Sequence, residues 1–277
     1  MKQDDSVTSS PKPQLSDWLT CVLRDPSPYE NFYLYDYNEK GPIHLEMKKH
    51  LLSLLVEARL DPDLLNASVE YLGWEKVKKF LVAPIQPTRI NMRRGEFGEI
   101  LISELLTNFF SYYIPVPKHR FIITSNQSLP GTDVIAIKKD DSRLTDVCFV
   151  ESKLRTTCDV SAAVRGCEQL NSDYTKRIPD MIRFVLNRLS EKKDPFFPEF
   201  LEYMCRREDM RDIERYVLGL IWDCEVWSET VLENLENELD DTHLPEFTVH
   251  VIQIGELVTL TNELFLEIGV EEILDNE

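Results

Sequence analysis

The chain has 277 residues, of which 43% are apolar, and this is enough to bury a sizeable core. It shows no apolar run of about 18 residues and no basic start followed by an apolar stretch, so we expect a cytoplasmic protein without a membrane span. The net charge of −18 arises mainly in residues 201–277, which hold 4 bases and 21 acids, whereas residues 91–200 hold 16 bases and 15 acids. Only this near-neutral middle segment could contact a nucleic-acid backbone without help from a partner.

The cysteines and histidines do not form a metal-binding pattern. The six cysteines lie in apolar or helical segments without paired CxxC motifs, so we expect buried free thiols rather than a zinc site or disulfides. The five histidines show neither HxxxH nor HExxH spacing. A histidine-ligated metal is therefore not expected.

The first third of the sequence predicts a short disordered end and then helices. Residues 1–15 are polar and contain two prolines, so we expect disorder there. Residues 16–90 predict a helical N-terminal region, because residues 44–60 carry apolar side chains at helical spacing and residues 61–62, Asp-Pro, begin a second helix. Two further prolines interrupt the pattern in residues 83–90. We therefore place a domain boundary near residue 90.

A helix, three short strands and a second helix are predicted next. Residues 93–110 show helical periodicity, whereas residues 120–125, 132–138 and 146–153 are short and rich in β-branched or aromatic residues. The loop between the second and third strands favours an antiparallel hairpin. Residues 159–176 return to helical spacing.

The last part of the sequence predicts further helices and strands. Two helices and then two strands are expected at residues 179–190, 198–215, 216–223 and 247–255. The whole order predicts an α/β fold with a mixed sheet that contains one early antiparallel hairpin. We assign residues 91–277 to this domain, with residues 201–277 as its acidic C-terminal part.

A glutamate and a lysine end the third predicted strand. Because side chains alternate along a strand, Glu151 and Lys153 point to the same face. The hairpin can bring Asp133 beside Glu151, and the helix before the hairpin carries Glu96 and Glu99 on neighbouring faces. A structural ion pair is the simpler interpretation of Glu151 and Lys153 alone, but the additional carboxylates favour a catalytic site.

These residue types together are suited to metal-dependent hydrolysis of phosphodiesters. Clustered carboxylates stay ionised together only when a cation lies between them. Oxygen ligands without histidine or thiolate select Mg²⁺ or Mn²⁺. A neighbouring lysine can hold an attacking water and offset charge that develops on a phosphoryl oxygen.

The motifs resemble those of known nucleases. The order GE, GTD and ESK resembles the PD-(D/E)xK nuclease superfamily, although GTD is a degenerate form of its first half. The segments RRGEFGEILISELL, GTDVIAI and FVESKLR are more closely similar to the HamA family, the nuclease subunits of bacterial Hachiman anti-phage systems. This resemblance covers about residues 90–190 and implies a restriction-endonuclease-like core of helix, three strands, helix and strand.

The resemblance also implies roles for individual residues. Asp133 and Glu151 would be catalytic residues and metal ligands, and Lys153 would be the catalytic lysine. Five more residues are implied around them, namely the carbonyl of Ser152 and the carboxylate of Glu99 as further ligands, Glu96 as the alternative to Glu99, and Gln169 and Tyr174 as accessory residues.

The implied function is a Mg²⁺- or Mn²⁺-dependent DNA nuclease in an anti-phage defence complex, controlled by a HamB-like superfamily 2 helicase. Acidic residues in 201–277 could dock on that helicase, and the chain has no P-loop of its own. Arg93 and Arg94 are expected to be solvated rather than bound to phosphate. Two alternatives stay open: a catalytically inactive adaptor or inhibitor whose acids imitate DNA, and an RNA-cutting toxin.

Overall fold

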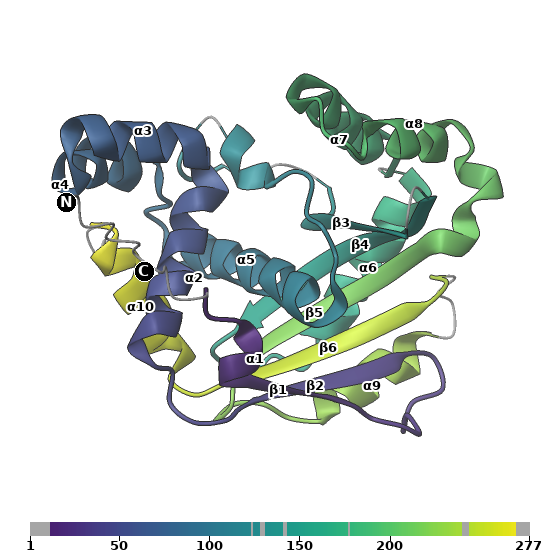
Figure 1. Ribbon diagram of the computed structural model, residues 1–277. Coiled ribbons are helices and arrows are strands. Elements are labelled where there is room, and N and C mark those ends of the chain that lie inside the picture. Colours follow the sequence, from purple (N-terminus) through teal and green to yellow (C-terminus); the bar gives the residue numbers. More distant parts are fainter. Residues whose placement is uncertain are drawn as a thin grey trace, which may run out of the picture.

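One mixed sheet of six strands runs through the part of the chain that the structure describes (Figure 1). The structure is a computed structural model that describes residues 12–122, 124–127, 131–140, 143–176, 178–239 and 244–269, without the side chains of residues 173–176. The strands are β1 (Leu19–Leu23), β2 (Tyr33–Glu39), β3 (Val134–Asp140), β4 (Arg143–Arg155), β5 (Glu214–Asp223) and β6 (Phe247–Ile254). Their order across the sheet is β1-β2-β6-β5-β4-β3.

Helices cover both faces of this sheet (Figure 1). One face packs against α1 (Leu15–Trp18), α2 (Leu45–Arg59), α5 (Ile90–Phe110) and α10 (Leu257–Glu267). The other face packs against α6 (Ala162–Lys176), α7 (Ile178–Lys192), α8 (Phe197–Cys205) and α9 (Thr230–Glu238). Between α2 and α5 the chain forms α3 (Pro62–Leu72), α4 (Trp74–Val77), a π-helical turn at Lys78–Val82 and a 3₁₀ turn at Ala83–Ile85. No helix in the described residues is long and apolar enough to cross a membrane.

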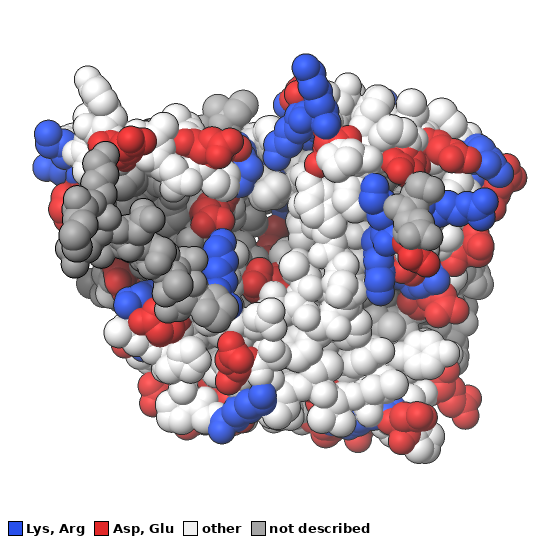
Figure 2. Space-filling view, in the orientation of Figure 1, with Lys and Arg blue, Asp and Glu red and all other residues white. Residues whose placement is uncertain are grey.

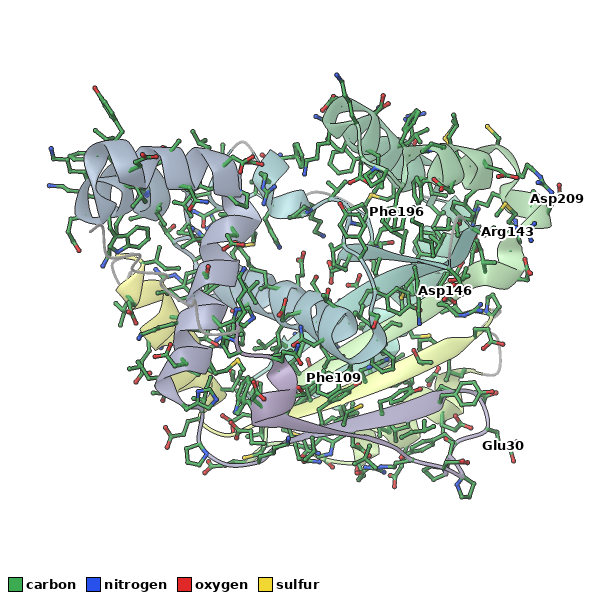
Figure 3. All side chains as sticks on the ribbon, viewed as in Figure 1. Glu30, Phe109, Arg143, Asp146, Phe196 and Asp209 are labelled. Atoms are coloured by element: carbon green, nitrogen blue, oxygen red, sulfur yellow. The ribbon has the colours of Figure 1, made fainter. Side chains whose placement is uncertain are left out.

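Alternation along the strands divides the core between the two faces. On β5, Val217 and Ile221 pack with α5, whereas Leu218 and Leu220 belong to the cluster beneath α6 and α9. At the far end of α5, Phe109 packs edge-on against a tyrosine of β2 with 5.5 Å between ring centroids (Figure 3). The central strands β5 and β6 are nearly continuous apolar runs because both faces of the sheet are buried there.

The central strands are parallel and the edges are antiparallel. Strands β2, β6, β5 and β4 pair in parallel, while β1 pairs antiparallel with β2 and β3 pairs antiparallel with β4. The predicted α/β class is therefore confirmed, and so is the hairpin, in which Val134 lies opposite Val150. The finer assignment to a PD-(D/E)xK core stays a prediction.

Two strands lie where the sequence predicts only helices. Within residues 16–90, β1 and β2 join the same sheet as β3 to β6, so the prediction of a helical region is wrong there. The reason is tertiary packing: Leu34 and Tyr37 of β2 are fully buried against the rest of the sheet, although short strands of mixed polarity give little periodic signal. The boundary near residue 90 stays a prediction, although the sheet takes strands from both sides of it.

The predicted strand at residues 120–125 is not formed in its described residues. Lys118–Phe121 is a 3₁₀ turn instead, and residue 123 lies outside the described part. Polar contacts override β-propensity here, since Lys118 and His119 reach Glu99 and Arg120 donates to the carbonyl of Glu57. The chain thus has two described strands, not three, between α5 and α6.

The C-terminal part also differs from its prediction. The helix expected at residues 198–215 ends at Cys205 as α8, and two 3₁₀ turns lead into β5 at Glu214. Strands β5 and β6 of the acidic C-terminal part lie in the middle of the sheet. The expected disorder of residues 1–15 falls outside the described part up to residue 11, whereas Leu15 already begins α1.

The cysteines are all free, and their burial was predicted only in part. Cys148 and Cys167 are buried, as expected for small apolar side chains. Cys158, Cys205 and Cys224 are exposed, because they lie in a loop after β4, at the end of α8 and after β5. The expectation of six buried thiols is therefore wrong for these three.

Candidate active site

Helix α5 lies close against β4 and β5 because glycine replaces a side chain at two contacts. A Cβ added to Gly98 would lie 3.3 Å from the Cβ of Leu154. A Cβ added to Gly219 would lie 3.0 Å from Ile102 of the helix. This close approach holds the middle of α5, and with it Glu99, beside the end of the β3–β4 hairpin.

The hairpin places two carboxylates together. Val134 pairs with Val150, so Asp133, which immediately precedes β3, lies opposite Glu151. Asp133 Oδ2 accepts hydrogen bonds from the backbone N–H of Ser152 at 2.8 Å and from its hydroxyl at 3.1 Å. Glu151 is 5% exposed. The backbone of β4 therefore fixes the Asp133 carboxylate next to Glu151.

Lys153 lies on the same side of β4 as Glu151. Its Nζ donates to Glu151 Oε1 at 2.5 Å. Its aliphatic stem runs along α6 at Gly166, where an added Cβ would lie 3.3 Å from Lys153 Cγ and 2.5 Å from Leu218. Because residue 166 is a glycine, α6 can pack over the Lys153 side chain. This packing keeps the ammonium group beside the carboxylate of Glu151.

These residues line one cavity of about 550 Å³. Glu99, Asp133, Glu151 and Lys153 all contribute to its wall. The remaining lining residues are mostly polar and come from α5, from β4 and from the loop after β4: Asn91, Arg94, Gly95, Ser152, Leu154, Arg155, Thr156, Thr157 and Asp159. Figure 2 shows acidic side chains in a hollow near the middle of the face that α5 covers.

Two basic residues that the sequence analysis missed complete the site. Lys118 Nζ lies 3.2 Å from Asp133 Oδ1 and 3.3 Å from Glu99 Oε2. His119 Nε2 lies 3.0 Å from the same oxygen of Glu99. Both come from the 3₁₀ turn Lys118–Phe121 and lie just before residues 120–125, for which the sequence predicts a strand. The available signal was three successive basic residues, Lys-His-Arg, between a proline and an apolar segment.

Glu96 is directed to a different partner. Arg59 of α2 binds it with both Nε and Nη2, at distances of 2.6 to 3.0 Å, and both side chains are 3% exposed. Such a forked, buried pair uses up both oxygens of the carboxylate. Of Glu96 and Glu99, only Glu99 lines the cavity, so the geometry favours Glu99 as the member of the site.

The carboxylates of the cavity have unequal electrostatic surroundings. Burial alone would raise the pKa of Glu99, but the positive charges of His119 and Lys118 outweigh it and the pKa is lowered. Burial, and next the charge of Glu99, raise the pKa of Asp133. Burial, and next the charge of Asp133, raise the pKa of Glu151 to about 8. For Asp133 and Glu151, burial and a neighbouring carboxylate therefore outweigh the positive charges of Lys118 and Lys153 beside them.

The oxygen donors fit a hard divalent cation of the kind that nuclease families imply. Glu151 Oε2 is buried and has no hydrogen-bond partner among the described residues. Within the same residues, no three His, Cys, Asp or Glu side chains are grouped closely enough to hold a metal ion by themselves. Mg²⁺ is commonly held by only one or two carboxylates, with water completing its shell, so Asp133 and Glu151 suffice as protein ligands.

Comparison with known proteins identifies the family. The sequence matches the HamA family over residues 12–268. The chain belongs to the HamA family. The Hachiman protein HamA of Bacillus cereus is 29% identical over 106 residues, which are 38% of this chain and 36% of that protein. The chain thus aligns with about a third of that relative's length, and the predicted resemblance to HamA is confirmed by the family match.

The remaining predicted residues of this HamA-family chain differ in where they lie relative to the cavity. Gln169 lies half-buried on α6 and is not among the described residues that line the cavity. Tyr174 also lies on α6, but its side chain is outside the described part. Arg93 is buried and donates to the carbonyl of Pro87, so the expectation of a solvated pair is wrong for it. Arg94 lines the cavity.

Proposed function

We propose that the chain is the nuclease subunit of a Hachiman anti-phage defence system and hydrolyses DNA phosphodiester bonds with Mg²⁺ or Mn²⁺. The observation that carries the proposal is the meeting of Asp133, Glu151 and Lys153 in one cavity, with Glu99 reaching it from α5. Membership of the HamA family and the name of the Bacillus cereus relative support the assignment to a defence system.

Each residue has a task that follows from its position. Asp133 and Glu151, with the carbonyl of Ser152, would hold the cation through oxygen atoms. The bound cation would lower the pKa of a water and offset charge on the phosphoryl oxygen. Lys153, fixed beside Glu151, would orient the attacking water and add a positive charge at the reacting phosphate. Arg94 on the cavity wall is placed to contact a neighbouring phosphate.

We propose further that a partner helicase controls access to DNA. A chain with a net charge of −18 has little electrostatic attraction for a phosphate backbone. Acids of the C-terminal part, such as Glu229 and Glu263, are about half exposed and could dock on a basic surface of that partner. The helicase would then supply both the ATP-driven step and much of the contact with DNA.

A cleavage assay tests the catalytic proposal. The purified chain is incubated with labelled DNA and RNA, with Mg²⁺ or with a chelator, alone and with the helicase encoded beside it. We expect DNA cleavage that requires the metal and falls by roughly 100-fold or more in Glu151→Gln and in Lys153→Met. Glu46→Gln, which changes an exposed acid on α2, is the matched control and should cleave as the wild type does.

One observation favours the inactive adaptor as a second candidate. Lys118 and Lys153 already neutralise carboxylates of the cavity by direct contact. An adaptor predicts no cleavage of either nucleic acid under any of these conditions, together with unchanged helicase binding in Glu151→Gln. Cleavage of RNA but not of DNA would instead support the toxin.

A further inference from the structure

Lys118 is a buried ammonium group that lies between two carboxylates of the candidate active site. Its side chain is 8% exposed, and its Nζ is within 3.3 Å of both Glu99 and Asp133. It also lies 3.5 Å from the carbonyl oxygen of Thr132. A compact positive charge with three oxygen neighbours occupies the kind of position that a small cation takes among carboxylates.

Lys118 compensates the charge of two carboxylates, whereas Lys153 of the ESK motif compensates the charge of one. Lys153 contacts only Glu151 in the cavity, and His119 contacts Glu99 from the side of α2. Lys118 is the residue that joins Glu99 to Asp133. Without it, two buried carboxylates would face each other with less compensation, and like charges at such a separation repel strongly.

Space for the lysine to move lies directly behind it. A second cavity, of about 320 Å³, is lined by Lys118, Glu99 and Asp133, by His119 and Arg120 of the 3₁₀ turn, and by mostly apolar residues of α2, α5 and the segment before that turn. Two further carboxylates, Glu57 and Glu104, line the same cavity. Lys118 does not line the 550 Å³ cavity that contains Glu151 and Lys153, so it approaches the carboxylates from the opposite side.

We propose that Lys118 is an internal counter-cation: in the metal-free protein it holds Glu99 and Asp133 together, and it withdraws into the second cavity when a divalent cation binds. The inference rests on the proposed metal-dependent function and adds a positioning residue outside the nuclease-like motif. The lysine keeps the carboxylates preorganised at the expense of metal affinity, because the cation must displace a positive charge before Asp133 can serve as its ligand.

Metal binding without any substrate tests this inference. Mn²⁺ is titrated into the purified chain by calorimetry, and Lys118→Met is compared with the wild type and with Lys48→Met, which removes a lysine paired to Glu263 away from the site. We expect Lys118→Met to bind Mn²⁺ at least about tenfold more tightly and to melt at a lower temperature when metal-free. A lysine with a merely structural role predicts the opposite sign, namely weaker binding together with lower stability, and that result would overturn the proposal.

A labelling experiment follows the lysine itself. The chain is treated with an amine-acetylating reagent with and without saturating Mn²⁺, and the modification of each lysine is measured by mass spectrometry. We expect Lys118 to be protected in the metal-free protein and labelled in the presence of Mn²⁺, while Lys48 is labelled equally in both. Protection of Lys118 that is unchanged by bound Mn²⁺ would contradict its withdrawal.

The same titrations separate this inference from the proposed function. Mn²⁺ binding that is unchanged in Glu151→Gln contradicts the proposed metal site, whatever Lys118 does. Binding by Lys118→Met but not by the wild type supports the counter-cation even if the wild type cleaves nothing. Absence of Mn²⁺ binding in both chains overturns the two proposals together.

Discussion

At the scale of single residues, the site is notable for how many charges it buries. A continuous series of ionic contacts runs from Arg59 through Glu96 and His119 to Glu99, and Lys118 continues it to Asp133. Each contact lies in or near the core, where removing one partner leaves the other without compensation. The network therefore consists of six residues: Arg59, Glu96, His119, Glu99, Lys118 and Asp133. Stability and chemistry therefore depend on neighbouring members of one network.

We expect Glu96 to serve stability and Glu99 to serve the function of the site. Glu96→Ala leaves the buried Arg59 without a counter-charge, so we expect a loss of about 3–5 kcal/mol in the free energy of unfolding. Replacing both partners, as Arg59→Met with Glu96→Met, should recover a part of it. Urea unfolding measures the effect, and a loss below about 1 kcal/mol in Glu96→Ala would contradict the assignment.

His250 makes stability depend on pH. It is buried in β6, its Nδ1 lies 2.9 Å from the hydroxyl of Tyr37, and burial lowers its pKa to about 3. Because the unfolded chain binds a proton near pH 6.5 and the folded chain does not, this contribution is complete above that pH and is lost as the pH falls towards 3. We expect the loss of stability from this residue to be about 2 kcal/mol at pH 5.

Urea unfolding at pH 7.5 and pH 5 measures this contribution as a difference between two chains. Other groups titrate in the same interval, so the wild type is compared with His250→Gln at both pH values. The wild type should lose about 2 kcal/mol more than the variant does on acidification. Equal losses in the two chains would show that His250 is protonated in the folded protein.

At the scale of elements, the sequence predicted the parts of the site that lie on regular structure. The helix that carries Glu99 and the hairpin that carries Asp133 and Glu151 have strong periodic signals, and both are present. Lys118 lies on a 3₁₀ turn whose position is fixed by tertiary contacts, so the basic run Lys-His-Arg did not by itself show that this side chain reaches Glu99. Strand β2 was missed for the same reason, since its inner partner, β6, lies more than 200 residues further along the chain.

Helix α5 and strand β5 are in such close contact that adding one methyl group at Gly219 should destabilise the protein. Gly219→Ala would place a Cβ 3.0 Å from Cγ1 and Cδ1 of Ile102, so the helix or the isoleucine must shift. We expect a loss of about 1–3 kcal/mol in stability. Adding Ile102→Val, which removes Cδ1, should recover a part of that loss although the variant alone is destabilising. Thermal unfolding of the two single variants and the double variant checks this; simple additivity of the losses would contradict the contact.

At the scale of the whole molecule, one sheet joins the N-terminal strands to the proposed nuclease residues. Strand β2 lies between β1 and β6, and its Leu34 and Tyr37 are fully buried. Strands β5 and β6, which belong to the acidic C-terminal part, lie in the middle of this sheet. The N-terminal strands, the site and the acidic surface are thus parts of one packed structure.

Removal of residues 1–40 should therefore abolish a stable monomer. The truncated chain would expose the edge of β6 and the apolar surface that β2 covers, and exposed strand edges promote aggregation. A chain that begins at residue 12 keeps β1 and β2 and is the matched control. Size-exclusion chromatography and thermal unfolding measure the outcome. A monomeric truncated chain with the control's melting temperature would show instead that residues 41–277 are stable without these strands.

The pairing of β2 with β6 also determines when the sheet can form during synthesis, because both strands must first be made. Residues 33–39 leave the ribosome more than 200 residues before their parallel partner, residues 247–254. Such long-range pairing slows folding, because loop closure must precede the contacts that stabilise it. Until residues 247–254 have been synthesised, β2 can pair only with β1, and a nascent chain is left with an open strand edge that is vulnerable to association with other chains.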